Sequence, residues 1–298
     1  MEAFRKNRRG GAALMLSLWA LFLLSAMVIS WALEIDSRLT LAGHANRILE
    51  AQALACSGAE VAQHSSIKPD SPALVGGFGK DQRYEAHITG EGGRLNINWV
   101  AAFPENPARV EVLRKYLENK GVDLDERDRM IDTLLDWIDP DNLVRLNGAE
   151  EEPGYKPANA PLKRLEEMKK IKGWEEFTSA KDWASDFTLD SSGPIDLKWA
   201  SRDVLLALPG ASEDRVDQFL TLRSGGDGID GTEDDAPIDQ ALVALGIPAQ
   251  QLAGLTVNGT DPVMRVVSVG TSGGVTRTVR LVFIKQGISI QLKSWKEF

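Results

Sequence analysis

The stretch Arg8–Glu34, "RRGGAALMLSLWALFLLSAMVISWALE", decides how this chain is organised. Residues 12–33 are 22 positions without a charge. At about 1.5 Å per residue, a helix of this length extends about 33 Å and can cross the hydrocarbon core of a membrane. Four basic residues precede the span: Arg5, Lys6, Arg8 and Arg9. This positive charge predicts a single-pass protein with a cytoplasmic N-terminus and the bulk of the chain on the other side.

The apolar span continues into an amphipathic helix without a break. After Glu34, apolar residues recur at spacings of three and four: Ile35, Leu39, Ala42, Ala45, Leu49, Ala53 and Cys56. No proline occurs before Pro69, so one helix is predicted from about Ala12 to about His64. A secretory signal peptide would be shorter and would end at a cleavage site and a break. The pattern favours a retained anchor, and a simple signal anchor remains the alternative.

Composition narrows the possible functions. The 298 residues suffice for one large or two ordinary domains. The net charge is −9 and the pI about 5.0, which argues against nucleic acid as the main partner, because phosphate binding needs a basic surface. The single cysteine excludes an internal disulfide, and three histidines leave little material for a zinc site or a His-based triad.

The rest of the chain predicts an α+β fold. Residues 82–100, "QRYEAHITGEGGRLNINWV", are typical of a hairpin of two alternating strands. Helical periodicity dominates the next hundred-odd residues, and residues 94–100 and 194–201 are expected to be short strands that bracket this helical block. Three further strands are expected near the C-terminus, at 262–270, 274–286 and 287–295. The expected fold has a long N-terminal helix, a small antiparallel sheet and a large helical insertion.

Two acidic loops are candidate calcium sites, since hard cations prefer several oxygen ligands. The first contains Asp136, Asp139, Asp141 and Glu150. The second, "GGDGIDGTEDDAP" (225–237), contains Asp227, Asp230, Glu233, Asp234 and Asp235. Its spacing differs from that of an EF-hand. A solvated acidic loop is the alternative at each place, and any calcium would be structural.

Other patterns favour structure over chemistry. The segment 204–216, "VLLALPGASEDRV", could be half of a helix-hairpin-helix that binds DNA, but Glu213 and Asp214 would repel phosphate. Asp132 and Asp136 share a helix face without any converging catalytic group. No phosphate-binding loop and no nucleophile with a plausible base is present in the sequence. A pilin-like DNA-uptake module and a membrane-anchored periplasmic enzyme therefore remain only as alternatives.

The N-terminus resembles a type IV prepilin, because a short basic leader ends in glycine before an apolar helix that continues as an amphipathic one. Four further motifs occur in an order similar to that of the type II secretion system minor pseudopilins of the general secretion pathway protein K family. They are "LLDWIDPDNL" with "NGAEEE", "YKPANAPL", "LEEMKKIKG" and "IDLKWASRDVLLALPG". Asp196 and Lys198 stand where the family has asparagines. The resemblance covers nearly the whole chain.

The resemblance implies a minor pseudopilin, not an enzyme, near the tip of a pseudopilus that exports folded proteins across the outer membrane. A prepilin peptidase would cut between Gly11 and Ala12, with Gly10 as the alternative site. Leu16, the fifth residue after that cut, stands where most pilins carry a glutamate. The implied partners are the inner membrane, the pseudopilus fibre and minor pseudopilins of the I and J families, contacted through the apolar stripe of the stem.

The implied divisions of the chain are a leader (1–11), a transmembrane helix (12–33), a periplasmic amphipathic stem (34–65), pseudopilin strands (66–100), a helical insertion (101–262) and C-terminal strands (263–298). Calcium in the acidic loops is part of what the resemblance implies.

Overall fold

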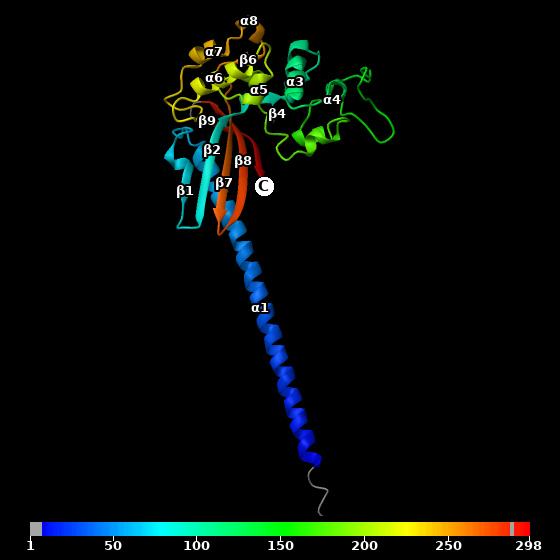
Figure 1. Ribbon diagram of the computed structural model, residues 1–298, viewed down its shortest axis with the longest axis vertical. Helices are drawn as coiled ribbons and strands as arrows, with labels where there is room; N and C mark the ends of the chain where they lie inside the picture. The colour runs from blue at the N-terminus through cyan, green and yellow to red at the C-terminus, as the bar shows by residue number, and fades with distance from the viewer. Residues whose placement is uncertain (1–7, 287–288) are drawn as a thin grey trace, which may run out of the picture.

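A long helix carries a globular head (Figure 1). The computed structural model describes residues 8–286 and 289–298. Helix α1 (Arg8–Gln63) is continuous, as the absence of proline predicts, and its first half extends away from the rest of the molecule. Side chains from Ala12 to Ala42 are exposed, whereas the last turns of α1 pack against a sheet. The predicted long N-terminal helix is confirmed.

The sheet has five antiparallel strands in the order β1-β2-β7-β8-β9. The strands are β1 (Val75–Gly77), β2 (Gln82–Gly90), β7 (Val263–Ser272), β8 (Val275–Gln286) and β9 (Ser289–Glu297). One face packs on α1 through a hydrophobic core that includes Ala55, Ala59, Val266 and Leu281. Small residues allow the close approach: a Cβ at Gly270 would lie 2.0 Å from the carbonyl oxygen of Ala51. The three predicted C-terminal strands are confirmed.

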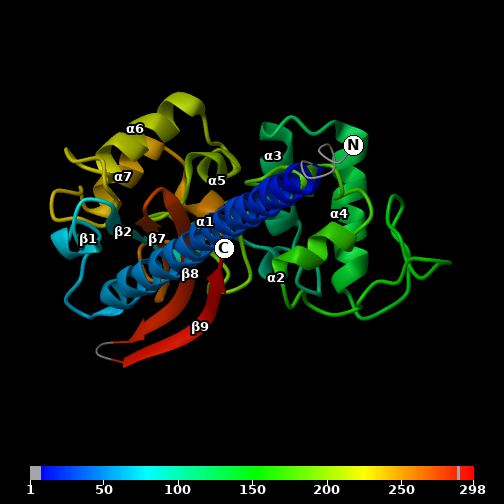
Figure 2. The same cartoon turned by 90° about the horizontal axis from the view of Figure 1, so that it is seen from below.

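Residues 91–262 lie between the neighbouring strands β2 and β7 and form most of the head. Their α-helices are α2 (Ile97–Val100), α3 (Pro107–Asn119), α4 (Leu124–Ile138), α5 (Arg202–Leu206), α6 (Glu213–Arg223), α7 (Ile238–Leu245) and α8 (Ala249–Leu252). Short parallel pairs join β3 (Leu95–Asn96) to β4 (Phe187–Thr188), and β5 (Ile195–Asp196) to β6 (Thr256–Val257). Short 3-10 helices occur at Glu91–Gly93, Leu165–Lys170 and Phe177–Ser179 in the insertion, and at Pro72–Leu74 before β1. Seen from below, α6 and α7 lie on one side of the head and α3 and α4 on the other (Figure 2).

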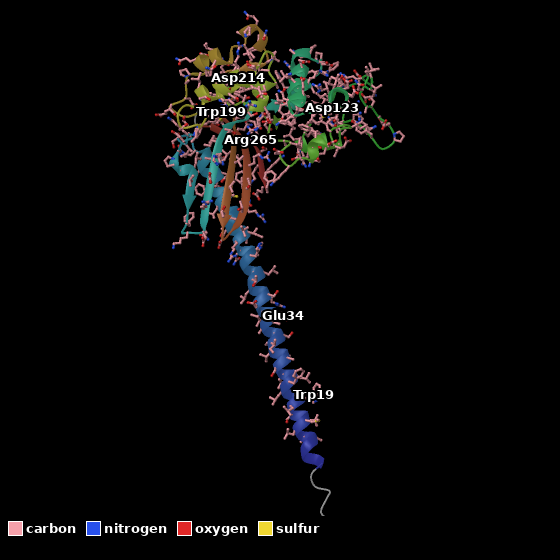
Figure 3. The ribbon with its side chains drawn as sticks, in the orientation of Figure 1. Trp19, Glu34, Asp123, Trp199, Asp214 and Arg265 are labelled. Atoms are coloured by element: carbon pink, nitrogen blue, oxygen red, sulfur yellow. The ribbon has the colours of Figure 1, made fainter. Side chains whose placement is uncertain are left out.

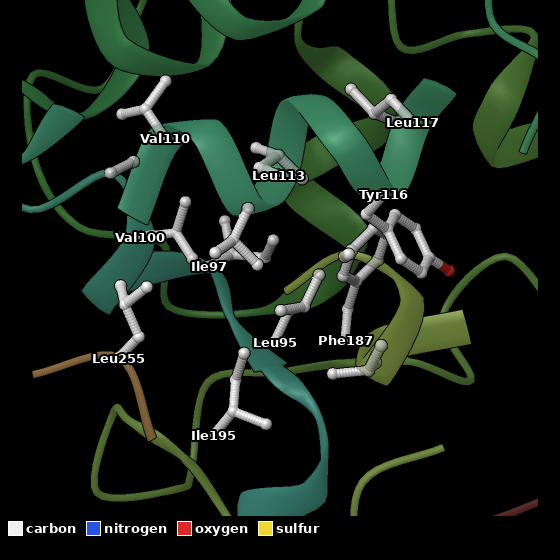
Figure 4. Close-up of a cluster of buried hydrophobic side chains, with 14 of the residues drawn as sticks. Leu95, Ile97, Val100, Val110, Leu113, Tyr116, Leu117, Phe187, Ile195 and Leu255 are labelled. Carbon is white, nitrogen blue, oxygen red and sulfur yellow. The ribbon is translucent and has the colours of Figure 1, made fainter. Parts of the chain in front are cut away.

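The insertion has a hydrophobic core of its own, separate from the helix–sheet core. Leu95, Ile97, Leu113 and Leu117 meet at its centre, next to the rings of Tyr116 and Phe187 (Figure 4). The Tyr116 and Phe187 ring centroids are 5.3 Å apart. Burying an aromatic ring of this size contributes about 2–3 kcal/mol. The insertion therefore folds around its own apolar centre and does not merely coat the sheet.

The predicted hairpin at 82–100 is wrong. Its first half is β2, but β2 pairs with β1 and β7. Only Leu95 and Asn96 of the second half form a strand, and they pair with Phe187–Thr188 inside the insertion. The Asn96 side chain then accepts a hydrogen bond from the Trp99 backbone N–H at 3.1 Å, which caps a short helix where the alternation predicted a strand. Similarly, only Ile195 and Asp196 of the expected strand 194–201 are extended.

Candidate functional site

The sequence places one candidate site at the start of α1. Gly10, Gly11 and Ala12 lie within the helix, while leader residues 1–7, including Arg5 and Lys6, lie outside the described residues. Leu16 is 71% exposed, and it belongs to the first half of α1, which extends away from the head (Figure 1). Of the helices in the described residues, α1 is the one long and apolar enough to cross a membrane, as a single-pass anchor requires. Figure 3 labels Trp19 and Glu34, which lie on this part of α1.

Most of the apolar stripe of the stem faces away from the sheet, whereas Cys56 at its end packs against the helix–sheet core. At 3.6 residues per turn, Leu39, Leu49 and Ala53 lie on the side of α1 opposite Ala51 and Ala55, which are fully buried against the sheet. Leu39 and Leu49 are each 67% exposed. One face of the helix therefore holds the sheet, and the other presents apolar side chains for contact with another helix.

The first acidic cluster surrounds an arginine that the sequence reasoning left out. Arg145 Nη1 donates to Asp136 Oδ1 at 2.6 Å and to Asp139 Oδ2 at 2.5 Å. The second oxygen of Asp136 accepts the Arg145 backbone N–H, and Asp141 accepts the backbone N–H of Leu143. The signal for Arg145 was its place in the acidic loop, six residues after Asp139.

Oxygens without partners remain beside this cluster. Both carboxylate oxygens of Glu150 and one of Asp139 are buried and lack a hydrogen bond. Burial, followed by the charges of Asp136, Asp139 and Asp141, raises the pKa of Glu150. No three carboxylates in the part of the chain that the structure describes already converge as a metal site. Carboxylate oxygens are the ligand type that calcium prefers, so Glu150 and Asp139 are the residues of this cluster that could contribute to holding a cation.

Each candidate carboxylate of the second acidic loop already has a hydrogen-bond or ion-pair partner among the described residues. Asp230 forms two 2.8 Å bonds with Arg223, and Glu233 pairs with Lys68 at 2.6 Å. Asp234 accepts the backbone N–H groups of Gly226 and Asp227 and the Thr232 hydroxyl. Asp227 and Asp235 likewise accept backbone N–H groups, from Ile229 and Gly231. Calcium at this loop would have to replace several of these bonds.

The possible DNA-binding turn is held by ion pairs. Arg202 donates to Asp217 at 2.6 Å and to Glu213 at 3.3 Å, so it ties α5 to the start of α6. Ser212 occupies the N-cap position of α6 but makes no capping hydrogen bond. Asp214 at the outer surface of the head adds negative charge at the same helix start (Figure 3). This arrangement fits a structural turn and repels phosphate.

Sequence reasoning also missed the junction between sheet and insertion. Glu91 is fully buried, and Arg265 donates to its two oxygens at 2.6 Å each. Thr188 also donates to Glu91, which links the carboxylate to β4. Figure 3 shows Arg265 where the sheet meets the insertion. Glu91 lies in "GEGG", which is typical of a turn, so nothing local indicated a buried charge.

Three kinds of comparison with known proteins each give a match. Residues 93–181 match the family profile described as "Type II secretion system (T2SS), protein K". The chain is 32% identical over 75 residues to the type II secretion system protein K of Klebsiella pneumoniae, an alignment that covers 23% of each protein. The fold matches a chain in the crystal structure of the GspK-GspI-GspJ complex from the enterotoxigenic Escherichia coli type 2 secretion system. That match has a TM-score of 0.56 at 16% identity and covers 89% of this chain and 98% of the other.

Proposed function

We propose that this chain, which belongs to the type II secretion system protein K family, is a minor pseudopilin needed for export of folded proteins across the outer membrane. The observation that carries the proposal is the architecture: an exposed apolar helix, a small sheet packed on its end, and a large insertion between two neighbouring strands. This architecture matches, over nearly the full length of both chains, a chain from a complex of three pseudopilins. The role is structural, not enzymatic.

The proposed placement is a single pass through the bacterial inner membrane. The basic leader stays in the cytoplasm and the head lies in the periplasm, as the positive charge before Ala12 favours. A prepilin peptidase cuts between Gly11 and Ala12, and Gly10 is the alternative. The part of α1 that follows the cut remains as the membrane anchor and stem.

A position at or near the pseudopilus tip fits two features. Leu16 is apolar, so it has no charge to pair with the N-terminal amine of a subunit above it. The insertion makes the head much wider than the stem, and a fibre built only from such subunits would bring the heads into collision (Figure 1). A single copy at the end of the fibre has no subunit above it to pair with and no neighbouring head of the same size to collide with.

Minor pseudopilins of the I and J families are the proposed partners, since the matched structure contains GspI and GspJ. The exposed stripe supplies the contact surface, because Leu39 and Leu49 face away from the sheet. Leu39→Glu or Leu49→Glu should abolish co-purification with the two partners. Ser37→Glu, an equally exposed position on the opposite face of α1, should leave it unchanged. Equal loss in all three variants would contradict the assignment of this face.

Structural calcium is proposed at the first acidic cluster. Glu150 and Asp139 supply the free oxygens, and the cation would offset the like charges that meet there. Calcium titrated calorimetrically into chelator-treated protein should bind, and Glu150→Gln should remove that binding. Glu233→Gln serves as the matched control in the second loop. Loss of binding only in Glu233→Gln would move the site to residues 225–237.

The experiment that tests the function is N-terminal mass spectrometry of membrane-extracted protein, made with and without a co-expressed prepilin peptidase. The expected result is a peptidase-dependent start at Ala12, which a bulky charged residue at Gly11 should prevent. A leader that stays intact in both samples would overturn the pseudopilin assignment. A secretion assay in cells that lack the chain should then show substrates retained in the periplasm.

A further inference from the structure

The sheet face opposite α1 carries a set of cations in register. Arg280 on β8 lies opposite Lys296 on β9, and Arg265 on β7 lies one row further along, opposite Val282. Val279 and Leu281, which alternate with these positions, face α1 in the helix–sheet core. Strand alternation therefore places Arg265, Arg280 and Lys296 together on the far side of the sheet.

A cavity of about 250 Å³ lies between this face and the insertion. The insertion contributes Lys163, Arg164 and the strand-end segment 188–190. Its charged lining residues are Glu91, Lys163, Arg164, Asp190, Arg265, Arg280, Lys293 and Lys296. Six of these side chains are cationic and two are anionic, although the chain as a whole is acidic.

The cations in this cavity outnumber the carboxylates that neutralise them. Arg265 uses Glu91, and Lys296 uses Glu166 at 2.9 Å. Arg280 is half-buried and, among the described residues, has no carboxylate within 4.0 Å. Burial, followed by the nearby Arg265, lowers the pKa of Arg280. The charges of Glu91 and Glu166 offset this effect only in part, so the site favours a further negatively charged group from a ligand.

A β-bulge adds a further cation at the cavity. Val282 pairs with Ser294 and Phe283 with Leu292, so Lys293 is the extra residue of β9. Such a bulge changes the direction of a side chain, and both Lys293 and Ser294 line the cavity. Lys293 Nζ donates to the carbonyl oxygen of Asp190 at 3.2 Å, not to a carboxylate. Its charge is therefore available to a ligand.

We propose that this cavity binds glutamate or aspartate carboxylates of an acidic peptide segment of a partner protein, with Arg280 and Lys293 as the principal contacts. Arginine binds carboxylates through paired N–H donors. Peptide is favoured over a free anion because β9 is the outer strand of the sheet, and its free backbone edge can pair with an extended chain. Glu91 and Asp190 in the lining disfavour the higher charge of phosphate. The site is distinct from the stem stripe and does not depend on the proposed function.

Fluorescence anisotropy with labelled hexaglutamate, on the full chain in nonionic detergent at low salt, tests this proposal. The expected result is salt-sensitive binding that Arg280→Gln and Lys293→Gln each weaken by about tenfold. Arg83→Gln is the matched control, since Arg83 is an exposed arginine on the same sheet face at the far end of β2. Circular dichroism and melting curves check that each variant is folded, and exposed Lys293 provides a variant with little risk to the fold.

Three outcomes would overturn the proposal. Equal affinity in Arg280→Gln, Lys293→Gln and Arg83→Gln would mean that the peptide binds without using the cavity. Inorganic phosphate that displaces hexaglutamate at equal concentration would make this a small-anion site. Tighter binding of a labelled oligothymidylate would make it a nucleic-acid site.

Discussion

Replacing Glu91 by glutamine should destabilise the head and at the same time strengthen anion binding beside it. Glu91 is fully buried and accepts both Arg265 bonds, and Arg94 lies 3.6 Å away. Burial, followed by the charge of Arg265, already lowers the pKa of Arg94 to about 10. Without the Glu91 charge, the buried Arg265 and the partly buried Arg94 would lack this counter-ion.

The expected loss follows from these contacts. Breaking a buried ion pair by removing one partner costs about 3–5 kcal/mol, because the remaining charge stays desolvated. For a domain of this size, each kcal/mol lowers the melting temperature by about 2–4 °C, so the expected decrease is about 6–20 °C. The double variant Glu91→Gln/Arg265→Met removes both charges and should recover most of the loss.

Thermal unfolding followed by circular dichroism, on detergent-solubilised protein at neutral pH, measures the effect. Glu85→Gln is the matched control, because Glu85 is a half-exposed carboxylate on β2 that pairs only with His87 at the surface. In the hexaglutamate assay, Glu91→Gln should bind more tightly than the parent chain, since the cavity gains positive charge. A decrease in melting temperature no greater than that of Glu85→Gln would refute this account of the junction.

Three further predictions concern the two cores and the contact between stem and sheet. Gly270→Ala should lower the free energy of unfolding by about 1–3 kcal/mol, since the added Cβ would meet the Ala51 backbone; Gly43→Ala, with nothing within 4 Å, should not destabilise the chain in the same denaturation experiment. Phe187→Ala should cost about 3–5 kcal/mol by leaving a cavity among aromatic rings, whereas Phe78→Ala, 70% exposed, should change stability by less than about 0.5 kcal/mol. Hydrogen bonds from Ser272 and Gln82 lower the pKa of Glu50 below its ordinary value of 4.5, so its contribution to stability is present above pH 4.5 and is lost as the pH falls through the lowered pKa. Glu50→Gln should therefore flatten the acid side of the stability–pH curve measured by melting temperature.

Features set by local periodicity were predictable from the sequence. The apolar run without charge and the absence of proline predicted α1, and strands were expected at 262–270 and 274–286, where β7 and β8 lie. The sequence also has a proline, Pro107, at the first residue of α3 and an apolar face on α4 from Met130 to Ile138, which fit the helical periodicity expected after residue 100. In each case the residues close by in the sequence determine the element.

Features that depend on distant partners were not predictable. Strands β3 and β4 have two residues each, and their pairing depends on the packing of the insertion. Glu91 and Arg265 are 174 positions apart, and only the fold brings them together. In the acidic loops the sequence supplied the carboxylates but not their neutralisation by Arg145, Arg223 and Lys68. The calcium assignment therefore remains a prediction.

The two ends of the insertion meet at a single rung of the sheet, where Gly90 of β2 pairs with Met264 of β7. Chain ends at that separation can also be joined by a tight two-residue turn, which would convert β2 and β7 into an ordinary hairpin. The core of the insertion is separate from the helix–sheet core, so exchanging one insertion for another leaves the helix–sheet core in place and mainly disturbs the Glu91 junction. The stem and sheet can therefore accept a different insertion between β2 and β7, in evolution or by protein engineering, while the membrane anchor stays the same.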